Sequence, residues 1–221
     1  MKTTRIILAI AATAVLAVTP TPSVAGEAGV STSPPFWTFA APPPAGYTKL
    51  IRSPQGLTAK FTTTELMAGH AVTLWIMFFD NPEACLVPAA CNPGDIGREG
   101  VRFDFHYAGG HIVNGRNTTI TGHLQVGETS TSGWAELVEI EMAPPFFVTP
   151  LTNPSGAQVI LALHSHGPAQ TGQTLASQIS SYLGGCNLPF LGDAGGFAES
   201  SADIPASPGE CSTIQLAFHN P

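Results

Sequence analysis

The sequence of 221 residues predicts a mostly β protein, an antiparallel β-sandwich or barrel with one short helix and disulfide cross-links. Three observations predict this class. Charged residues make up only 10% of the chain, while 23 glycines and 20 prolines supply frequent turns. Short stretches of alternating apolar and polar residues recur between those turns. The four cysteines are even in number and follow an N-terminus that is typical of exported proteins.

Residues 1–25 have the pattern of a secretory signal peptide. Lys2 and Arg5 precede the apolar run Ile6–Val18, and Ser23-Val24-Ala25 is a small-x-small cleavage site. The run is shorter than the roughly 18 consecutive apolar residues that a membrane span needs, and no later stretch reaches that length. We therefore expect cleavage after the last of these residues and a secreted or periplasmic protein without a membrane span.

The remainder of the chain is predicted to contain a Pro-rich N-terminal segment and a single β domain. Residues 26–47 include Ser33-Pro34-Pro35 and Pro42-Pro43-Pro44, so we expect an extended leader strand or tether. Residues 48–221 have the size of one ordinary domain. The whole chain carries a net charge of -7, and loss of the basic signal makes it more acidic still. This charge argues against nucleic acid and anionic membrane surfaces as partners.

The first half of the domain shows strand patterns and a hairpin signal. Alternation from Leu57 to Thr62 predicts a strand with one wet face, and residues 71–79 are apolar on both faces, as in a central strand. Residues 101–107 alternate again until Gly109-Gly110 ends the pattern. Asn114-Gly115 predicts a hairpin between Ile112-Val113 and a strand at residues 118–126.

The second half predicts three more strands, the helix and a long loop. The strands are expected at residues 134–142, 158–166 and 212–219, the last with Ile214, Leu216 and Phe218 facing inward. Leu175, Ile179 and Tyr182 recur at helical spacing between Thr171, a candidate N-cap, and Gly184-Gly185. The loop at residues 187–210 is a candidate recognition surface for a partner or a glycan.

The cysteines are expected to form disulfides, for which three pairings exist in principle. Sequence proximity favours Cys85 with Cys91 and Cys186 with Cys211, because each pair brackets a segment rich in Pro and Gly. On the chain-entropy model the short loop contributes about 2.4 kcal/mol and the long loop about 3.5 kcal/mol. Metal thiolate or redox chemistry is the competing interpretation, and the lack of a Cys-x-x-Cys motif argues against it.

The seven histidines are the main residues with chemical capacity. His164 and His166 lie one residue apart in a predicted strand, so both side chains project from one face, opposite Val159, Leu161 and Leu163. Two imidazoles about 6 to 7 Å apart on a strand can share a copper or zinc ion. His106 and His123, on the polar faces of their strands, are candidates for the further ligand that such a site needs.

The alternative interpretation of the histidine pair is structural. His164 then closes the strand through a hydrogen bond, and His166 helps to form the turn into Gly167-Pro168. The sequence predicts no catalytic residue, since no Gly-x-Ser-x-Gly elbow is present and no serine is marked as an activated nucleophile.

One segment, His164-Ser165-His166-Gly167-Pro168-Ala169, carries the resemblance to known families. Together with four further segments it resembles a family of secreted bacterial proteins without an assigned activity, over most of residues 57–219. Those segments are Asn81-Pro82-Glu83-Ala84-Cys85, Gly109-Gly110-His111, Asn153-Pro154-Ser155-Gly156-Ala157 and Gly184-Gly185-Cys186. The resemblance implies an envelope or extracellular protein and supplies no reaction.

The same His-x-His segment is locally similar to CHRD domains, which are extracellular β domains with suggested binding or structural roles. The rest of the chain, including the cysteine pairs, departs from that family. Copper/zinc superoxide dismutases also place a His-x-His pair on a sandwich strand. Their further histidines and metal-bridging aspartate have no residue-by-residue match in this chain.

The sequence therefore favours an exported soluble β domain with a non-catalytic binding or structural role in the cell envelope or the extracellular space, and with no cofactor. The alternative is a copper- or zinc-binding protein or metalloenzyme that uses His164 and His166. The sequence names neither the envelope or extracellular ligand nor the number of subunits.

Overall fold

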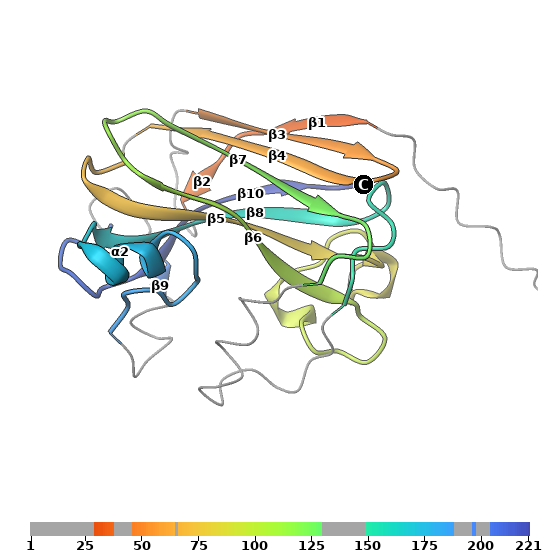
Figure 1. The fold of residues 1–221 in the computed structure, drawn as a ribbon. Coiled ribbons are helices and arrows are strands. Elements are labelled where there is room, and N and C mark those ends of the chain that lie inside the picture. The colour runs from red at the N-terminus through yellow and green to blue at the C-terminus, as the bar shows by residue number, and fades with distance from the viewer. Residues whose placement is uncertain (1–28, 38–45, 65, 130–148, 188–195, 198–203) are drawn as a thin grey trace, which may run out of the picture.

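The computed structural model describes residues 29–37, 46–64, 66–129, 149–187, 196–197 and 204–221. In these residues the chain forms two sheets that lie face to face (Figure 1). The small sheet has the order β1-β3-β4-β7, from β1 (Val30–Ser33), β3 (Gly46–Ser53), β4 (Gly56–Thr63) and β7 (Thr118–Gln125). All its neighbouring strands are antiparallel.

The large sheet has the order β2-β10-β8-β5-β6. Its strands are β2 (Phe36–Trp37), β10 (Ser212–His219), β8 (Gln158–Pro168), β5 (His70–Phe79) and β6 (Phe103–Ile112), and β9 (Gly196–Phe197) pairs in parallel with β10. The helices of the described residues are α2 (Gly172–Gln178) and the short 3-10 turns η1 (Pro82–Ala84) and η2 (Pro93–Asp95). The predicted mostly β class is confirmed, as a sandwich.

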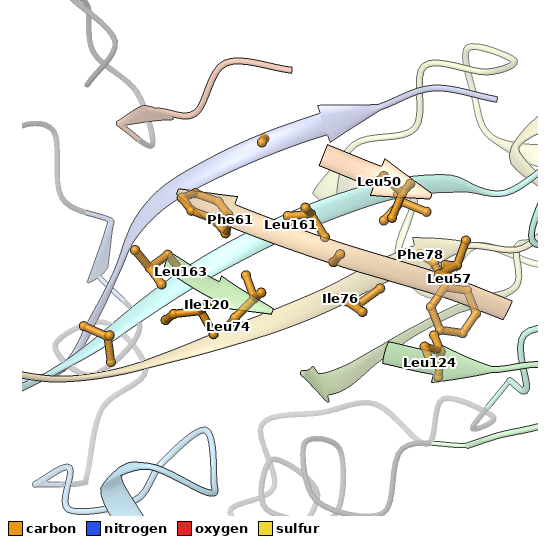
Figure 2. Close-up of a cluster of buried hydrophobic side chains, with 14 of the residues drawn as sticks. Leu50, Leu57, Phe61, Leu74, Ile76, Phe78, Ile120, Leu124, Leu161 and Leu163 are labelled. Carbon is orange, nitrogen blue, oxygen red and sulfur yellow. The ribbon is translucent and has the colours of Figure 1, made fainter. Parts of the chain in front are cut away.

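The main core fills the space between the two sheets (Figure 2). Alternate positions of each strand point into it, which is why the period of two in the sequence marks the buried face. Leu57, Phe61 and Leu124 from the small sheet meet Leu74, Ile76, Phe78, Leu161 and Leu163 from the large sheet. Each of these side chains is at most 1% exposed, and burial of one contributes about 2 kcal/mol.

A second apolar cluster covers the opposite face of the large sheet. Trp75 and Phe105 are 5.3 Å apart between ring centroids, and Phe79 and Phe103 are 4.8 Å apart. The Cys85–Cys91 segment closes over this cluster. β5 therefore lies between β6 and β8 with both faces buried, which confirms the predicted central strand.

The predicted hairpin at Asn114-Gly115 is wrong. β6 pairs with β5 in the large sheet, whereas β7 pairs with β4 in the small sheet, so this turn carries the chain from one sheet to the other. Gly109 and Gly110 also do not end their strand, because β6 continues to Ile112. A Cβ at Gly110 would lie 1.9 Å from the carbonyl oxygen of Ile179, so glycine lets the segment after α2 approach the strand closely.

The last strand differs from its predicted pattern. A register shift between Thr213 and Gln215 interrupts the alternation of β10. Ile214 consequently points into the main core, while Leu216 and Phe218 pack on the second cluster, on the other face. A bulge of this kind reverses which face each later residue occupies, so the prediction that all three face inward is wrong.

Two further regions differ from the prediction, and three predicted segments lie wholly or largely outside the described residues. In the Pro-rich segment, β1 pairs with β3 and β2 pairs with β10, so its described residues belong to the sheets. The helix α2 ends at Gln178, short of the predicted stop at Gly184-Gly185. The predicted strand at residues 134–142 and the signal at residues 1–25 lie outside the described residues, as does much of the 187–210 loop.

Candidate functional site

The histidine pair lies on the face of β8 predicted from the sequence. Val159, Leu161 and Leu163 point into the main core, whereas His164 and His166 follow Ile160 and Ala162 on the opposite face. Both histidines are fully buried. β5 and β10 flank β8, so the pair lies in the middle of the large sheet, beneath the segment that follows α2.

His166 has a hydrogen-bond partner at each ring nitrogen. Nδ1 lies 2.9 Å from the carbonyl oxygen of Gly184, and Nε2 lies 2.9 Å from the hydroxyl of Thr73. A carbonyl only accepts, so Nδ1 carries the proton and Nε2 accepts from the hydroxyl. The same hydroxyl accepts the indole N–H of Trp75 at 2.9 Å. His166 is therefore held in one orientation and one tautomer.

His164 is less completely paired. Its ring stacks on Tyr182 with centroids 4.4 Å apart and lies edge-on to His166 at 4.9 Å. Nδ1 is 3.3 Å from the hydroxyl of Thr213, which also lies 3.2 Å from the hydroxyl of Tyr182. Nε2 is buried and has no hydrogen-bond partner in the described part of the chain. This nitrogen is the one unsatisfied polar atom of the pair, and such groups call for an explanation.

The disulfide between Cys186 and Cys211 lies against the histidines. It joins the segment after α2 to the start of β10, and the sulfur atoms are 3.8 Å and 4.0 Å from Nδ1 of His166. The second disulfide joins Cys85 to Cys91. Both predicted pairings are thus confirmed, and one of them borders the histidine pair.

Burial keeps the histidines of this site uncharged. It lowers the pKa of His166 to about 4, and it lowers the pKa of His164 well below its usual value, with a further contribution from the neighbouring His166. Burial raises the pKa of Tyr182. The site is therefore a neutral interior at pH 7, and a neutral imidazole is the form that binds a metal ion.

The other two candidate ligands do not join the pair. His106 lies on β6 with Nε2 3.6 Å from a carboxylate oxygen of Glu128, and His123 lies on β7 with Nδ1 3.0 Å from the hydroxyl of Thr58. Neither belongs to the cluster, whose members are His164, His166, Cys186 and Cys211. The reason is topological: β7 belongs to the other sheet, and β5 separates β6 from β8.

A second candidate site is the outer face of the small sheet, which sequence reasoning treated only as a wet face. Nine of its outward side chains are Thr, Lys, Tyr or His, and we call these nine the threonine-lysine face: Thr32, Tyr47, Lys49, Thr58, Lys60, Thr62, Thr119, Thr121 and His123. Val30, Ile51, Ser53 and Gln125 lie on the same side of the sheet. The outward positions of the described strands carry no carboxylate.

Cross-strand contacts fix the positions of these side chains. Lys49 on β3 stands directly opposite Lys60 on β4. The ammonium of Lys60 lies 5.4 Å from the ring centroid of Tyr47, and its hydrogen bond to the phenol is the largest cause of the lowered pKa of that tyrosine. The hydroxyls of Thr62 and Thr119 are 3.0 Å apart. The face thus presents two ammonium groups among ordered hydroxyls.

The sequence predicts the histidine pair and both disulfides, but it does not predict their contact or the residues around them. Thr73 and Tyr182 contact the pair, and Trp75 contacts Thr73, only through strand pairing and the return of the chain after α2. The register of β5 against β8, which places Thr73 opposite His164, is the signal that was lacking.

In the residues that the structure describes, no helix is long and apolar enough to cross a membrane. Comparison with protein-family models, with curated proteins and with solved structures found no match to this chain.

Proposed function

We propose that this protein is an exported β-sandwich domain that binds an acidic polysaccharide of the cell envelope or the extracellular space without turning it over. The signal pattern at residues 1–25 and the two disulfides support export. A role in binding is supported by the threonine-lysine face, which combines ammonium groups, hydroxyls and an exposed aromatic ring on a rigid sheet.

The observation that carries the proposal is the pairing of Lys49 with Lys60 in a chain of net charge -7. Like charges directly opposite each other on neighbouring strands destabilise a sheet. An anionic ligand that neutralises both ammonium groups converts this cost into binding free energy. Tyr47, 44% exposed, lies beside Lys60 and offers a flat ring of the kind on which sugars pack.

The burial and the hydrogen bonding of the histidine pair support the absence of turnover. His164 and His166 are fully buried, and both nitrogens of His166 are engaged in hydrogen bonds. Side chains in this state are positioned to stabilise the fold rather than to exchange protons with a substrate.

The test is binding of residues 26–221 to polygalacturonate, with uncharged dextran as the comparison polymer. We expect saturable binding to the polyanion that weakens as salt rises and no binding to dextran. K49Q/K60Q removes both ammonium groups, and at about 0.5 kcal/mol or more for each charge the affinity falls at least about fivefold.

The matched control is R98Q/R116Q, which removes two positive charges from exposed side chains outside the threonine-lysine face. Its affinity should stay close to that of the wild type. Equal binding by K49Q/K60Q and R98Q/R116Q, or no binding of the wild type to the polyanion, would overturn the proposal. Shortening of the polymer during incubation would contradict the absence of turnover.

The second candidate function is copper or zinc binding by His164 and His166. One observation favours it: Nε2 of His164 is buried without a hydrogen-bond partner among the described residues. A metal ion at that nitrogen would satisfy it.

A further inference from the structure

The histidine pair and the Cys186–Cys211 disulfide form one compact cluster of metal-ligating atoms. One ring nitrogen of each histidine and the two sulfur atoms all lie within 4.8 Å of one another. In the described residues this is the single group of three or more His, Cys, Asp or Glu side chains close enough to hold a metal ion. In the present structure the two sulfurs are bonded to each other, so neither is a thiolate.

We propose that reduction of the Cys186–Cys211 disulfide converts this cluster into a tetrahedral Zn²⁺ site with His164, His166, Cys186 and Cys211 as its ligands. Two cysteines and two histidines are a common ligand set of structural zinc sites. The disulfide then acts as a redox switch. In the oxidised protein the covalent bond joins the segment after α2 to β10, and in the reduced protein the metal ion joins them.

The geometry of the cluster is close to that of a zinc site. Zn–S bonds of about 2.3 Å and Zn–N bonds of about 2.0 Å place tetrahedral ligand atoms roughly 3.3 to 3.8 Å apart. The longest separation in the cluster, within 4.8 Å, therefore closes by about 1 Å. The Cα atoms of Cys186 and Cys211 are 5.7 Å apart, which lets the released sulfurs separate by side-chain rotation.

Charge explains why reduction is the requirement. His164 and His166 are fully buried, and an imidazole supplies no negative charge, so in the oxidised protein a divalent ion would carry its whole charge into an interior without an anion. Two thiolates supply the two missing negative charges, and the resulting Zn²⁺ site is neutral. A neutral site suits this interior, where an uncompensated charge is costly.

Thr73 can serve as the outer partner of His166 in the metal-bound form as it does in the present one. Nδ1 of His166 faces both sulfurs and would bind the metal in place of its hydrogen bond to the carbonyl of Gly184, which moves the ring proton to Nε2. The hydroxyl of Thr73 can then accept a hydrogen bond from Nε2–H, because a hydroxyl oxygen has two acceptor sites and Trp75 occupies one. An outer partner on the second ring nitrogen is what metal-binding histidines require.

The redox step uses a dithiol as the reductant. A thiolate of the dithiol attacks the sulfur of Cys186, which is the more exposed of the two cysteines, and Cys211 leaves as a thiolate. The second thiolate of the dithiol then attacks the mixed disulfide, so the dithiol leaves as a cyclic disulfide and Cys186 leaves as a thiolate. Two electrons pass to the protein, and the two thiolates bind Zn²⁺ in place of protons.

The test compares zinc content of residues 26–221 in the oxidised and the reduced state. One sample is kept oxidised, and the other is reduced anaerobically with excess dithiol, which is removed by desalting before any metal is added; both are then given Zn²⁺ and desalted. We expect about one Zn²⁺ per chain after reduction and at least tenfold less in the oxidised protein. Co²⁺ in place of Zn²⁺ should give the intense visible absorption of a tetrahedral thiolate site.

The Cys85–Cys91 disulfide provides a matched control. C85S/C91S should still take up Zn²⁺ after reduction, whereas C186S/C211S should take up none in either state. Three outcomes would overturn the proposal: equal zinc in oxidised and reduced wild type, no zinc in reduced wild type, or undiminished zinc in C186S/C211S. The first two need no substitution, so a folding defect of a variant does not affect them. Polysaccharide binding is not involved in any of these measurements.

Discussion

The hydroxyl of Thr73 on β5 lies 2.9 Å from Nε2 of His166 on β8 and joins the two central strands of the large sheet through their side chains. It also accepts the indole N–H of Trp75. One hydroxyl thereby satisfies two buried nitrogen atoms on this face of the sheet. Unpaired buried polar groups are costly. Removing the hydroxyl of Thr73 therefore measures how much these two hydrogen bonds contribute to the free energy of unfolding.

T73V is expected to lower the free energy of unfolding by about 1 to 3 kcal/mol, because valine keeps the shape of threonine but leaves the nitrogens of Trp75 and His166 without a partner. Urea unfolding followed by tryptophan fluorescence measures it. T58V is the control: Thr58 pairs with His123 on the exposed face, and its loss should change stability by no more than about 0.5 kcal/mol. Equal effects of the two substitutions would contradict the prediction.

D80N is expected to destabilise the protein by about 3 kcal/mol. Asp80 is 2% exposed, and its carboxylate accepts hydrogen bonds from Arg102, from the hydroxyl and backbone N–H of Thr152, and from the N–H of Asn153. An amide in its place removes the charge and turns one acceptor into a donor that faces other donors. E83Q removes the same charge from an exposed residue, and a similar melting temperature for both variants would refute the prediction.

The two disulfides are expected to contribute unequally. The Cys186–Cys211 bond spans 25 residues and the Cys85–Cys91 bond spans 6, so the chain-entropy model gives losses of about 3.5 and about 2.4 kcal/mol for C186A/C211A and C85A/C91A. Urea unfolding in the presence of a chelator measures both losses. A melting temperature of the wild type that does not change under reductant would contradict the role of these bonds as cross-links.

His219 is expected to make stability fall as the pH falls from about 6.5 to about 4. Its Nε2–H donates to Thr48, whose hydroxyl donates to a carbonyl, so Nδ1 accepts from Ser31. Burial, and then the nearby Arg52, lower the pKa of His219 to about 4. Between pH 6.5 and pH 4, the imidazole is therefore protonated in the unfolded chain but not in the folded chain. This difference lowers the free energy of unfolding by about 3 kcal/mol across the range.

The measurement is urea unfolding of wild type and H219Q at several pH values between 7.5 and 4. H219Q should be less stable at pH 7.5, but its stability should decline less steeply as the pH falls. The other buried histidines have lowered pKa values with the same sign, so the informative quantity is the difference between the two profiles. Parallel profiles would show that His219 is not the group concerned.

Much of the fold follows from local patterns in the sequence. Alternation predicts β4, β8 and β10, because a residue's side of a strand depends only on its position along that strand, and a continuous apolar run predicts β5. The same rule placed His164 and His166 together on one face of β8. Sequence proximity paired the cysteines, because a short loop costs the least entropy to close.

The remaining features were decided by contacts between residues far apart in the chain. Asn114-Gly115 has the residues of a hairpin, yet packing of the two sheets sends β7 to β4. A bulge in β10 reverses the faces of Leu216 and Phe218, and the alternation of residue types does not show it.

The histidine pair shows the same division. The sequence alone determined that His164 and His166 share a face. Only the tertiary structure decided that the Cys186–Cys211 disulfide faces them, rather than His106 and His123. Periodicity reports the burial of each strand by itself, whereas strand order is set by the packing of the whole core, which no local pattern contains.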